Sequence, residues 1–237
     1  MVHDIKSRVQ SLDWEAIQQE LDEQGFAKLP PILTKAECES FMELYSDEQL
    51  YRTKINMTRY RFGSGEYKYF SYPLPELIQG LRESFYAELT KTANRWLGYL
   101  KKPEQYPNTL EDFLKTCEEK EQTRPTPLIL KYEKGGFNCM HQDLYGDVFF
   151  PFQVVFILNQ HNQDYTGGEF LLVEQIPRAQ SRGHVLTVDQ GGAIIFPTNY
   201  RPAQGKKDYY KNTLRHGVST ITSGERYGLG IIFHDAK

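Results

Sequence analysis

The sequence predicts an α+β protein with a sandwich or jelly-roll core, and the order of two kinds of segment supports this. Before residue 127, several stretches carry apolar side chains at helical spacing, and the longest covers residues 77–97. After residue 127, short runs rich in Val, Ile, Leu and Phe are separated by clusters of Gly, Asn, Asp and Pro. Many short strands that follow a helical start indicate packed sheets with helices on one side.

Local signals define the elements before residue 127. Apolar residues recur at helical spacing from Trp14 until Gly25 ends the pattern. Thr34 and Glu37 have the spacing of a capping box, which opens the next helix. The expected elements are a helix over 13–24, a strand over 26–29, a helix over 35–45, a hairpin or mobile loop over 51–72, a long helix over 77–97 and an acidic helix over 110–120.

The second half is expected to consist of short strands. The residues alone suggest that the last two strands form a hairpin that turns at Ser223 and Gly224. No repeat, low-complexity tract or linker marks a boundary, so we predict one domain over residues 1–237, with mainly helical support over 1–126 and a strand core over 127–237. The expected strands cover residues 128–132, 152–158, 168–173, 185–188, 193–196, 214–221 and 227–234.

The composition limits the classes of partner. The 237 residues carry a net charge of −3, which gives no overall field that would attract DNA or an anionic membrane. Three widely spaced cysteines include no Cys-x-x-Cys pair, the usual spacing of zinc and redox motifs. The start lacks the apolar core of a signal peptide, and no later apolar run is long enough to span a bilayer. We therefore expect a cytoplasmic protein without a membrane partner.

A candidate metal site begins with His141 and Asp143. If this segment is extended, both side chains point to one face, so an imidazole and a carboxylate converge. The pair alone is a weak signal, because so short a motif often arises by chance. A third ligand would have to come from elsewhere in the chain, and His216 stands out among the other histidines because it lies in an expected strand beside the small Gly217. Cys139 would share the face of His141, although a small buried side chain is the favoured interpretation.

Arg226 opens the last expected strand, which would place its positive charge in the interior of the protein. A guanidinium in the interior needs an anion, and its two-pronged geometry suits a carboxylate. The pattern therefore predicts an acidic co-substrate. His184 and His234 are interpreted as structural residues. His234 also ends an expected strand, but unlike His216 it has no Arg after it in the sequence. Three further polar residues could line a pocket around the candidate metal site or be hydrogen-bonded within the sheets and their loops, namely Asn138, Gln153 and Asn199.

In this order of motifs the sequence resembles the 2-oxoglutarate- and Fe(II)-dependent dioxygenases. Tyr132 opens Tyr-x-x-Gly, His-x-Asp follows at residues 141–143, and Gly-Gly-Glu-Phe occupies residues 167–170 ahead of the distal His and Arg. From about residue 13 to residue 233, the chain resembles an uncharacterised bacterial family of these oxygenases. That family has been described by similarity as acting on alkylated DNA and elsewhere as prolyl-hydroxylase-like.

The resemblance implies roles for individual residues. His141, Asp143 and His216 would bind the metal and form the catalytic centre, while Arg226 would hold the distal carboxylate of 2-oxoglutarate with help from Tyr132. The implied fold is the double-stranded β-helix, a jelly-roll variant, in which the strands over 214–221 and 227–234 belong to opposite sheets. The implied cofactors are Fe(II), 2-oxoglutarate and O2, with ascorbate as a candidate stimulant.

The implied reaction is hydroxylation of a C–H bond in a protein, peptide or small-molecule substrate, with release of succinate and CO2. Two alternatives stay open, oxidative demethylation of alkylated nucleobases in DNA or RNA and a non-catalytic cupin-like binding module. Basic, Tyr-rich stretches over 51–69 and 201–215 keep nucleic acid as a less favoured partner. Against repair, residues 130–132 read Leu-Lys-Tyr where the alkylated-base repair enzymes carry Asn-x-Tyr.

Overall fold

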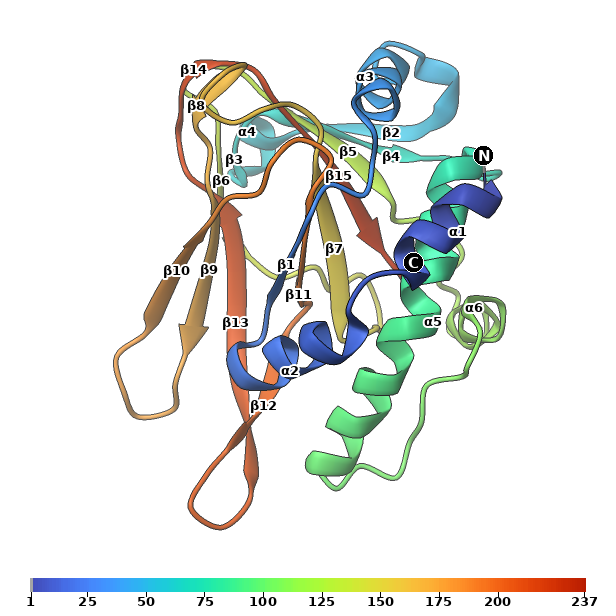
Figure 1. Cartoon of the computed structure of the whole chain (residues 1–237), viewed down its shortest axis with the longest axis vertical. Helices are drawn as coiled ribbons and strands as arrows, with labels where there is room; N and C mark the ends of the chain where they lie inside the picture. Colours follow the sequence, from blue (N-terminus) through green and yellow to red (C-terminus); the bar gives the residue numbers. More distant parts are fainter. Residues whose placement is uncertain (1) are drawn as a thin grey trace.

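Two antiparallel sheets face each other in the computed structural model, which describes the chain from residue 2 and the side chains from Asp4 onward (Figure 1). The seven-stranded sheet has the order β1 (Ala27–Leu29), β11 (Ala193–Pro197), β7 (Phe152–Ile157), β15 (Arg226–Ile232), β5 (Leu128–Tyr132), β4 (Glu66–Phe70) and β2 (Tyr51–Asn56). The six-stranded sheet contains β10 (Arg182–Leu186), β9 (Phe170–Gln175), β13 (Tyr209–Val218), β6 (Phe137–His141) and β3 (Gly63–Ser64), with β12 (Tyr200–Gln204) paired to β13. β8 (Tyr165–Gly167) pairs separately with β14 (Ile221–Gly224).

The helices come mainly from the first half of the chain, and the α+β jelly-roll prediction is confirmed. The expected helices and the capping box at Thr34 are present. The first helix is not among the elements expected from the sequence, because its short polar pattern gives little signal. The helices are α1 (Val2–Gln10), α2 (Trp14–Gln24), α3 (Lys35–Leu44), the 3-10 turn η1 (Glu48–Leu50), α4 (Met57–Tyr60), α5 (Glu76–Tyr99) and α6 (Leu110–Glu118).

The first half also contributes strands to the main sheet. β1 pairs with β11, and the hairpin expected over residues 51–72 is formed by β2 and β4. β4 continues the sheet by pairing with β5, so both halves of the chain share one sheet. The short helix α4 lies within this hairpin, between β2 and β3.

The simple hairpin suggested by the residues at Ser223 and Gly224 is wrong. β13 lies in the six-stranded sheet and β15 in the seven-stranded sheet, as the resemblance implied. Between them, the chain runs through β14, whose partner is β8 rather than a neighbouring segment. A local turn signal gives no information about which sheet the chain enters next, and this explains the error.

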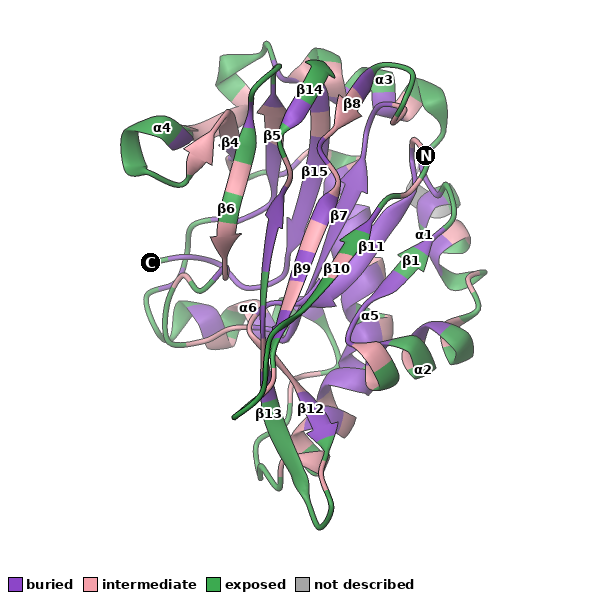
Figure 2. Ribbon diagram, turned by 90° about the vertical axis from the view of Figure 1, so that its left-hand side faces the viewer, coloured by how far each residue is buried: buried purple, intermediate pink, exposed green. Residues whose placement is uncertain are grey.

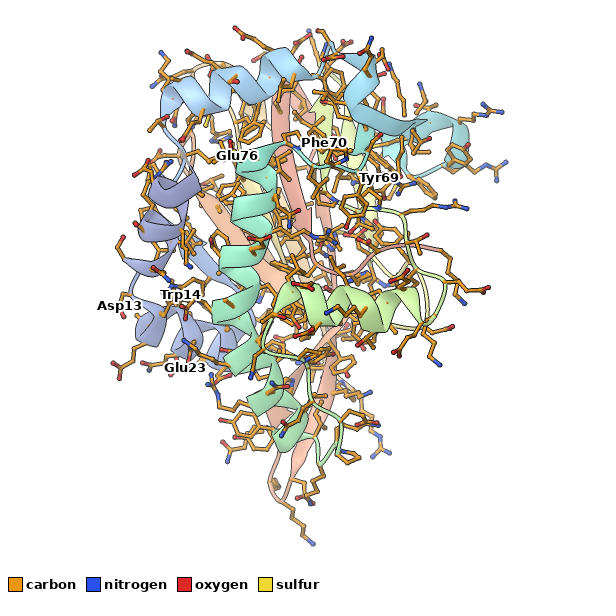
Figure 3. All side chains as sticks on the ribbon, turned by 90° about the vertical axis from the view of Figure 1, so that its right-hand side faces the viewer. Asp13, Trp14, Glu23, Tyr69, Phe70 and Glu76 are labelled. Carbon is orange, nitrogen blue, oxygen red and sulfur yellow. The ribbon has the colours of Figure 1, made fainter. Side chains whose placement is uncertain are left out.

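Alternation along β7 separates the core from the site. Val154 and Phe156 belong to the large core beneath α5, and the rings of Phe85 and Phe156 meet edge to face with centroids 5.9 Å apart. Gln153 and Val155 face the space between the sheets. Figure 3 shows α5 crossing the outer face of the main sheet, with Trp14 of α2 beside it. Although α5 has 24 residues, no helix within residues 2–237 is long and apolar enough to cross a membrane.

The two sheets differ in burial. Every residue of β7 is buried, whereas β6 and β10 of the opposite sheet consist mostly of exposed and half-buried residues (Figure 2). The six-stranded sheet is therefore covered on one face only. Its inner face turns toward the seven-stranded sheet and carries the residues described next.

Glu37, the capping carboxylate of α3, is bound by Arg8 of α1 through two hydrogen bonds of 2.8 and 2.6 Å. The bond from Arg8 lowers the pKa of Glu37 from 4.5 to about 2. A carboxyl whose pKa is lower in the folded state stabilises the fold above its unfolded pKa, and this stabilisation disappears as the pH falls through the folded pKa. Glu37→Gln should therefore lower the free energy of unfolding by about 1–2 kcal/mol at pH 7.

Urea denaturation at pH 7 and at progressively lower pH measures this effect. The difference between Glu37→Gln and the unaltered chain should shrink between about pH 4.5 and pH 2, the interval set by the unfolded and folded pKa values. Glu39→Gln is the control, since Glu39 forms only an exposed pair with Lys35 at 3.8 Å. Equal stability of the Glu37 and Glu39 variants at pH 7 would contradict this account.

Candidate metal centre

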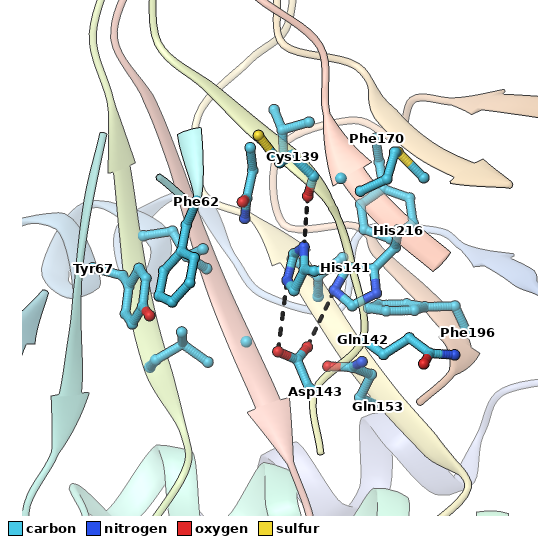
Figure 4. Close-up of a pocket in the computed structure, with 18 of the residues that line it drawn as sticks. Phe62, Tyr67, Cys139, His141, Gln142, Asp143, Gln153, Phe170, Phe196 and His216 are labelled. Carbon is cyan, nitrogen blue, oxygen red and sulfur yellow. Dashed lines mark hydrogen bonds and ion pairs between the residues drawn. The ribbon is translucent and has the colours of Figure 1, made fainter. Parts of the chain in front are cut away.

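Three side chains converge on one point between the two sheets. His141 ends β6 and lies directly opposite His216 of β13, while Asp143 follows two residues after His141. Nε2 of His216 is 3.1 Å from Oδ2 of Asp143, and Nε2 of His141 is 3.6 Å from Oδ1 (Figure 4). One ligand atom from each residue lies within 4.8 Å of the other two. Two imidazoles and one carboxylate form the donor set that suits non-haem Fe(II).

The protonation states also suit metal binding. Nδ1 of His141 donates to the carbonyl oxygen of Cys139 at 2.8 Å, which fixes the tautomer and leaves the Nε2 lone pair facing Asp143. Burial, and then the neighbouring His141, lower the pKa of His216, so this ring is neutral at pH 7. Burial alone would raise the pKa of Asp143, but a positive charge on either histidine when it is protonated, together with hydrogen bonds from His216 and Tyr145, brings the pKa below its usual value.

A glycine allows the two ligand strands to approach. A Cβ atom on Gly217 would lie 2.6 Å from the carbonyl oxygen of Asn138, so a larger residue would push β13 away from β6. The pairing of β13 and β6 shifts register immediately after His216. The rings of Phe170 and Phe196 pack against His216 with centroid distances of 5.8 and 4.7 Å, which fixes its orientation. The sequence therefore builds this site at a local irregularity of the sheet.

Arg226 lies in the same interior space, and two of its three guanidinium nitrogens have no hydrogen-bond partner among the described residues. Its side chain is 1% exposed, and Nε and Nη2 make no hydrogen bond to any residue that the structure describes. Its backbone pairs with Tyr132 of β5, and the guanidinium carbon lies 5.6 Å from the centroid of that tyrosine ring. Gly168 has a φ of +68°, and a Cβ atom there would be 2.9 Å from Cδ of Arg226. A buried guanidinium with two unpaired nitrogens fits an anion.

One cavity of about 350 Å³ contains both the ligand triad and Arg226. Its volume is in the range of small-molecule sites. Tyr132 is fully buried in its wall, and the hydroxyl of Tyr132 accepts a hydrogen bond of 3.3 Å from Asn138. Most of the remaining wall is apolar, formed by Leu128, Leu130, Val155, Phe170 and Phe196 among others. The residues present thus fit Fe(II) beside a small dicarboxylate.

The other residues singled out from the sequence occupy varied positions. Cys139 is exposed at the cavity wall, so its interpretation as a small buried side chain is wrong, because β6 lies near the edge of its sheet. His234 is fully buried outside the triad, accepts a hydrogen bond from the backbone of Phe150, and has its pKa lowered to about 4 by burial. Gln153 lines the cavity, whereas His184 packs against Phe26.

Sequence reasoning missed three residues of the site. Tyr145 donates to Oδ1 of Asp143 at 2.6 Å, and its position two residues further on continues the alternation that selected the ligands. Gln142 points the other way and donates to the backbone oxygens of Asn199 and Leu214, both at 2.9 Å, which ties the ligand segment to β13. Tyr165, buried beside the guanidinium of Arg226, gives no local signal.

The fold resembles that of solved 2OG-Fe(II) oxygenases and prolyl hydroxylases, and the site carries a donor set that suits Fe(II). The fold is similar to that of a Pseudomonas putida prolyl-4-hydroxylase, with a TM-score of 0.56 and 14% identity over 94% of this chain and 99% of that one. A 2OG-Fe(II) oxygenase family oxidoreductase from Burkholderia pseudomallei gives a TM-score of 0.56 and 17% identity over 95% and 94%.

The particular family is shown by the sequence. Residues 65–236 match the Oxygenase-NA family, described as an oxygenase catalysing oxidative methylation of damaged DNA, and the chain belongs to this family. The uncharacterized proteins Rv2227 and MT2286 of Mycobacterium tuberculosis are each 47% identical to it over 167 residues, which is 70% of this chain and 72% of theirs. The prediction of an enzyme is confirmed, and the alternative of a non-catalytic binding module is set aside, because the family is one of oxygenases.

Proposed function

We propose that this chain is a Fe(II)- and 2-oxoglutarate-dependent hydroxylase in which His141, Asp143 and His216 hold the metal. Arg226, with Tyr132, would hold the distal carboxylate of 2-oxoglutarate. The observation that carries the proposal is a buried guanidinium with two unpaired nitrogens in the cavity of three converging ligands. Fe(II) and 2-oxoglutarate supply the oxidation when bound, placing one oxygen atom of O2 in succinate and the other in a substrate C–H bond while CO2 leaves.

The residues of the chain bind and orient the reacting groups. One carboxylate among the three ligands would offset only one of the two positive charges of Fe(II), and a dianionic co-substrate would then leave the site with a net negative charge, so a further cation nearby is needed. Arg226 supplies this cation and fixes direction, because a guanidinium binds a carboxylate through two parallel bonds. The apolar wall formed by Phe170, Phe196 and Val155 limits the access of water to the site.

Formation of succinate tests this function without knowledge of the substrate. Purified chain with Fe(II), O2 and 2-oxoglutarate should form succinate slowly even when no substrate is added. His216→Ala should remove this activity, while His184→Ala, outside the triad, should retain it. A folded, anaerobically reconstituted sample that neither binds iron nor forms succinate would overturn the proposal.

For the substrate, our first candidate class is a protein, a peptide or a small molecule. The net charge of −3 does not favour association with a polyanion. Apolar side chains form much of the cavity wall, and the polar groups that line it besides the ligands are amides such as Gln153 and Asn138, several tyrosines, Arg61 and Arg226. Such a wall suits an aliphatic segment whose C–H bond faces the metal.

A specific feature of the cavity rim favours a second candidate, an alkylated nucleobase. Tyr60 and Phe62 stack with centroids 5.6 Å apart and are 48% and 47% exposed. The guanidinium of Arg59 lies 5.9 Å from the Tyr60 ring, and Arg61 and Phe62 line the cavity. Exposed aromatic rings beside cations are suited to an unstacked base and its phosphates. The description of the family as acting on damaged DNA supports the same candidate.

The two basic stretches do not form one surface. The stretch over 51–69 reaches the cavity through Arg61 and Phe62, whereas no residue of 201–215 lines it. Lys206 and Lys207 lie in the connection between β12 and β13, at the opposite end of the molecule from α4 (Figure 1). Only the first stretch is therefore placed to contact a substrate that enters the cavity.

If the nucleobase candidate is right, the rim should bind single-stranded oligonucleotides with an affinity that falls steeply with salt. Replacing Tyr60 and Phe62 by Ala should weaken binding by roughly 1–3 kcal/mol for each stacked base. Arg59→Glu with Arg61→Glu should abolish binding but leave succinate formation without substrate intact. Fluorescence anisotropy at two salt concentrations measures these effects.

Lys206→Glu with Lys207→Glu is the matched control, because it makes the same change of charge far from the cavity. This control should bind oligonucleotides almost as well as the unaltered chain. Equal losses in the two charge-reversed variants would mean non-specific attraction. Absence of salt-dependent binding and of turnover on methylated DNA or RNA would eliminate the nucleobase and leave the first class of substrate.

A further inference from the structure

Asp143 is held by a hydrogen-bond chain that reaches a different strand. The hydroxyl of Tyr145 donates to Oδ1 of Asp143 at 2.6 Å. The hydroxyl of Tyr69, in β4, donates to the hydroxyl oxygen of Tyr145 at 3.0 Å. The guanidinium carbon of Arg52 lies 4.5 Å from the centroid of the Tyr69 ring, which is only 7% exposed. These hydrogen bonds therefore connect Tyr69, in the main sheet, through Tyr145 to the carboxylate of the ligand triad.

The backbone around Asp143 explains why such a chain is useful. His141 is the last residue of β6, so its position is fixed by pairing with β13. Asp143 and Tyr145 follow in an irregular segment that belongs to neither sheet. Strand pairing fixes the positions of the two histidines, whereas the position of Asp143 depends on hydrogen bonds to its side chain.

The two oxygens of Asp143 have different surroundings. Oδ2 faces Nε2 of His216 at 3.1 Å. Oδ1 accepts the proton of Tyr145 and lies 3.6 Å from Nε2 of His141. An oxygen that accepts a short, charge-assisted hydrogen bond from a hydroxyl is a weaker metal ligand than the other oxygen, whose neighbour, Nε2 of His216, is itself a candidate ligand atom. The arrangement thus favours binding through Oδ2 alone.

We propose that Tyr145 is a positioning residue that keeps Asp143 a one-oxygen ligand, and that Tyr69 orients Tyr145 for this purpose. The inference rests on the proposed function, since it concerns the metal held by the triad. A carboxylate that binds through both oxygens occupies one more coordination position. Binding through one oxygen leaves that position open for the co-substrate or O2.

Tyr145→Phe tests the inference because it removes only the hydroxyl group. Asp143 lies outside the paired strands and loses the bond that holds it in place, so calorimetric titration with Mn(II), without co-substrate, should show about 10–100-fold weaker binding than in the unaltered chain. The visible absorption of the Co(II)-loaded variant should also change in intensity, because this intensity reports the coordination number. Tyr69→Phe keeps the bond between Tyr145 and Asp143 and should give a smaller change in the same direction.

Tyr86→Phe is the matched control. Tyr86 is a fully buried tyrosine whose hydroxyl donates to the carbonyl oxygen of Pro107 at 2.8 Å, away from the site. This variant should lose a comparable hydrogen bond and keep both the Mn(II) affinity and the Co(II) spectrum. Unchanged affinity and spectrum in Tyr145→Phe would overturn the inference while the proposed function stands. Failure of the unaltered chain to bind Mn(II) would overturn both.

Discussion

Replacement of His141, Asp143 or His216 by Ala is expected to abolish Fe(II) binding and, with it, succinate formation. Each residue supplies one of three converging ligand atoms, so two ligands remain in each variant. Two ligands on an otherwise apolar wall are too few to hold Fe(II) against water. Bound iron after anaerobic reconstitution and desalting measures the effect, since it does not depend on the unidentified substrate.

The control for the ligand variants is His184→Ala. His184 is partly exposed and packs against Phe26, outside the ligand triad. Its removal should leave the iron content unchanged. Iron retained by all three ligand variants, in chains that unfold at the same temperature as the unaltered one, would place the metal elsewhere.

Arg226→Ala is expected to keep the metal and lose most of the affinity for 2-oxoglutarate. Removing one partner of a buried, hydrogen-bonded charge pair costs about 2–5 kcal/mol. The dissociation constant of 2-oxoglutarate should therefore rise by more than about tenfold. Anaerobic calorimetric titration of the Mn(II)-loaded protein measures it directly.

Arg226→Lys distinguishes the geometry of the fork from its charge. Lysine retains the cation but cannot form two parallel bonds to one carboxylate, so its affinity should lie between those of Arg and Ala. The Mn(II) affinity of both variants should match that of the unaltered chain, because Arg226 is not among the ligand atoms. Unchanged affinity for 2-oxoglutarate in Arg226→Ala would refute the role of Arg226.

The sequence predicted best those elements whose signals are local. The helix that follows Asp13 and the capping box at Thr34 formed as expected, because a helix depends on residues within a few positions. Strand pairing depends on distant partners. This explains why the residues alone placed β13 and β15 in one hairpin, and why β12, which pairs only with β13, went unnoticed.

The candidate site shows the same division. The spacing of His141 and Asp143 suggested the pair, since alternation brings positions i and i+2 of an extended segment to one face, but the pair alone was a weak signal. The pairing of His216 opposite His141 and the burial of Arg226 are tertiary facts that spacing does not contain. The bond from Tyr69 to Tyr145 joins residues 76 positions apart, so no local pattern could reveal it.

The most direct test of the central claim is a crystal structure of the chain with Mn(II) and 2-oxoglutarate under anaerobic conditions. The account predicts an anomalous peak between His141, Asp143 and His216, with 2-oxoglutarate density reaching from the metal to the guanidinium of Arg226. A metal bound at other residues, or a distal carboxylate that points away from Arg226, would contradict it.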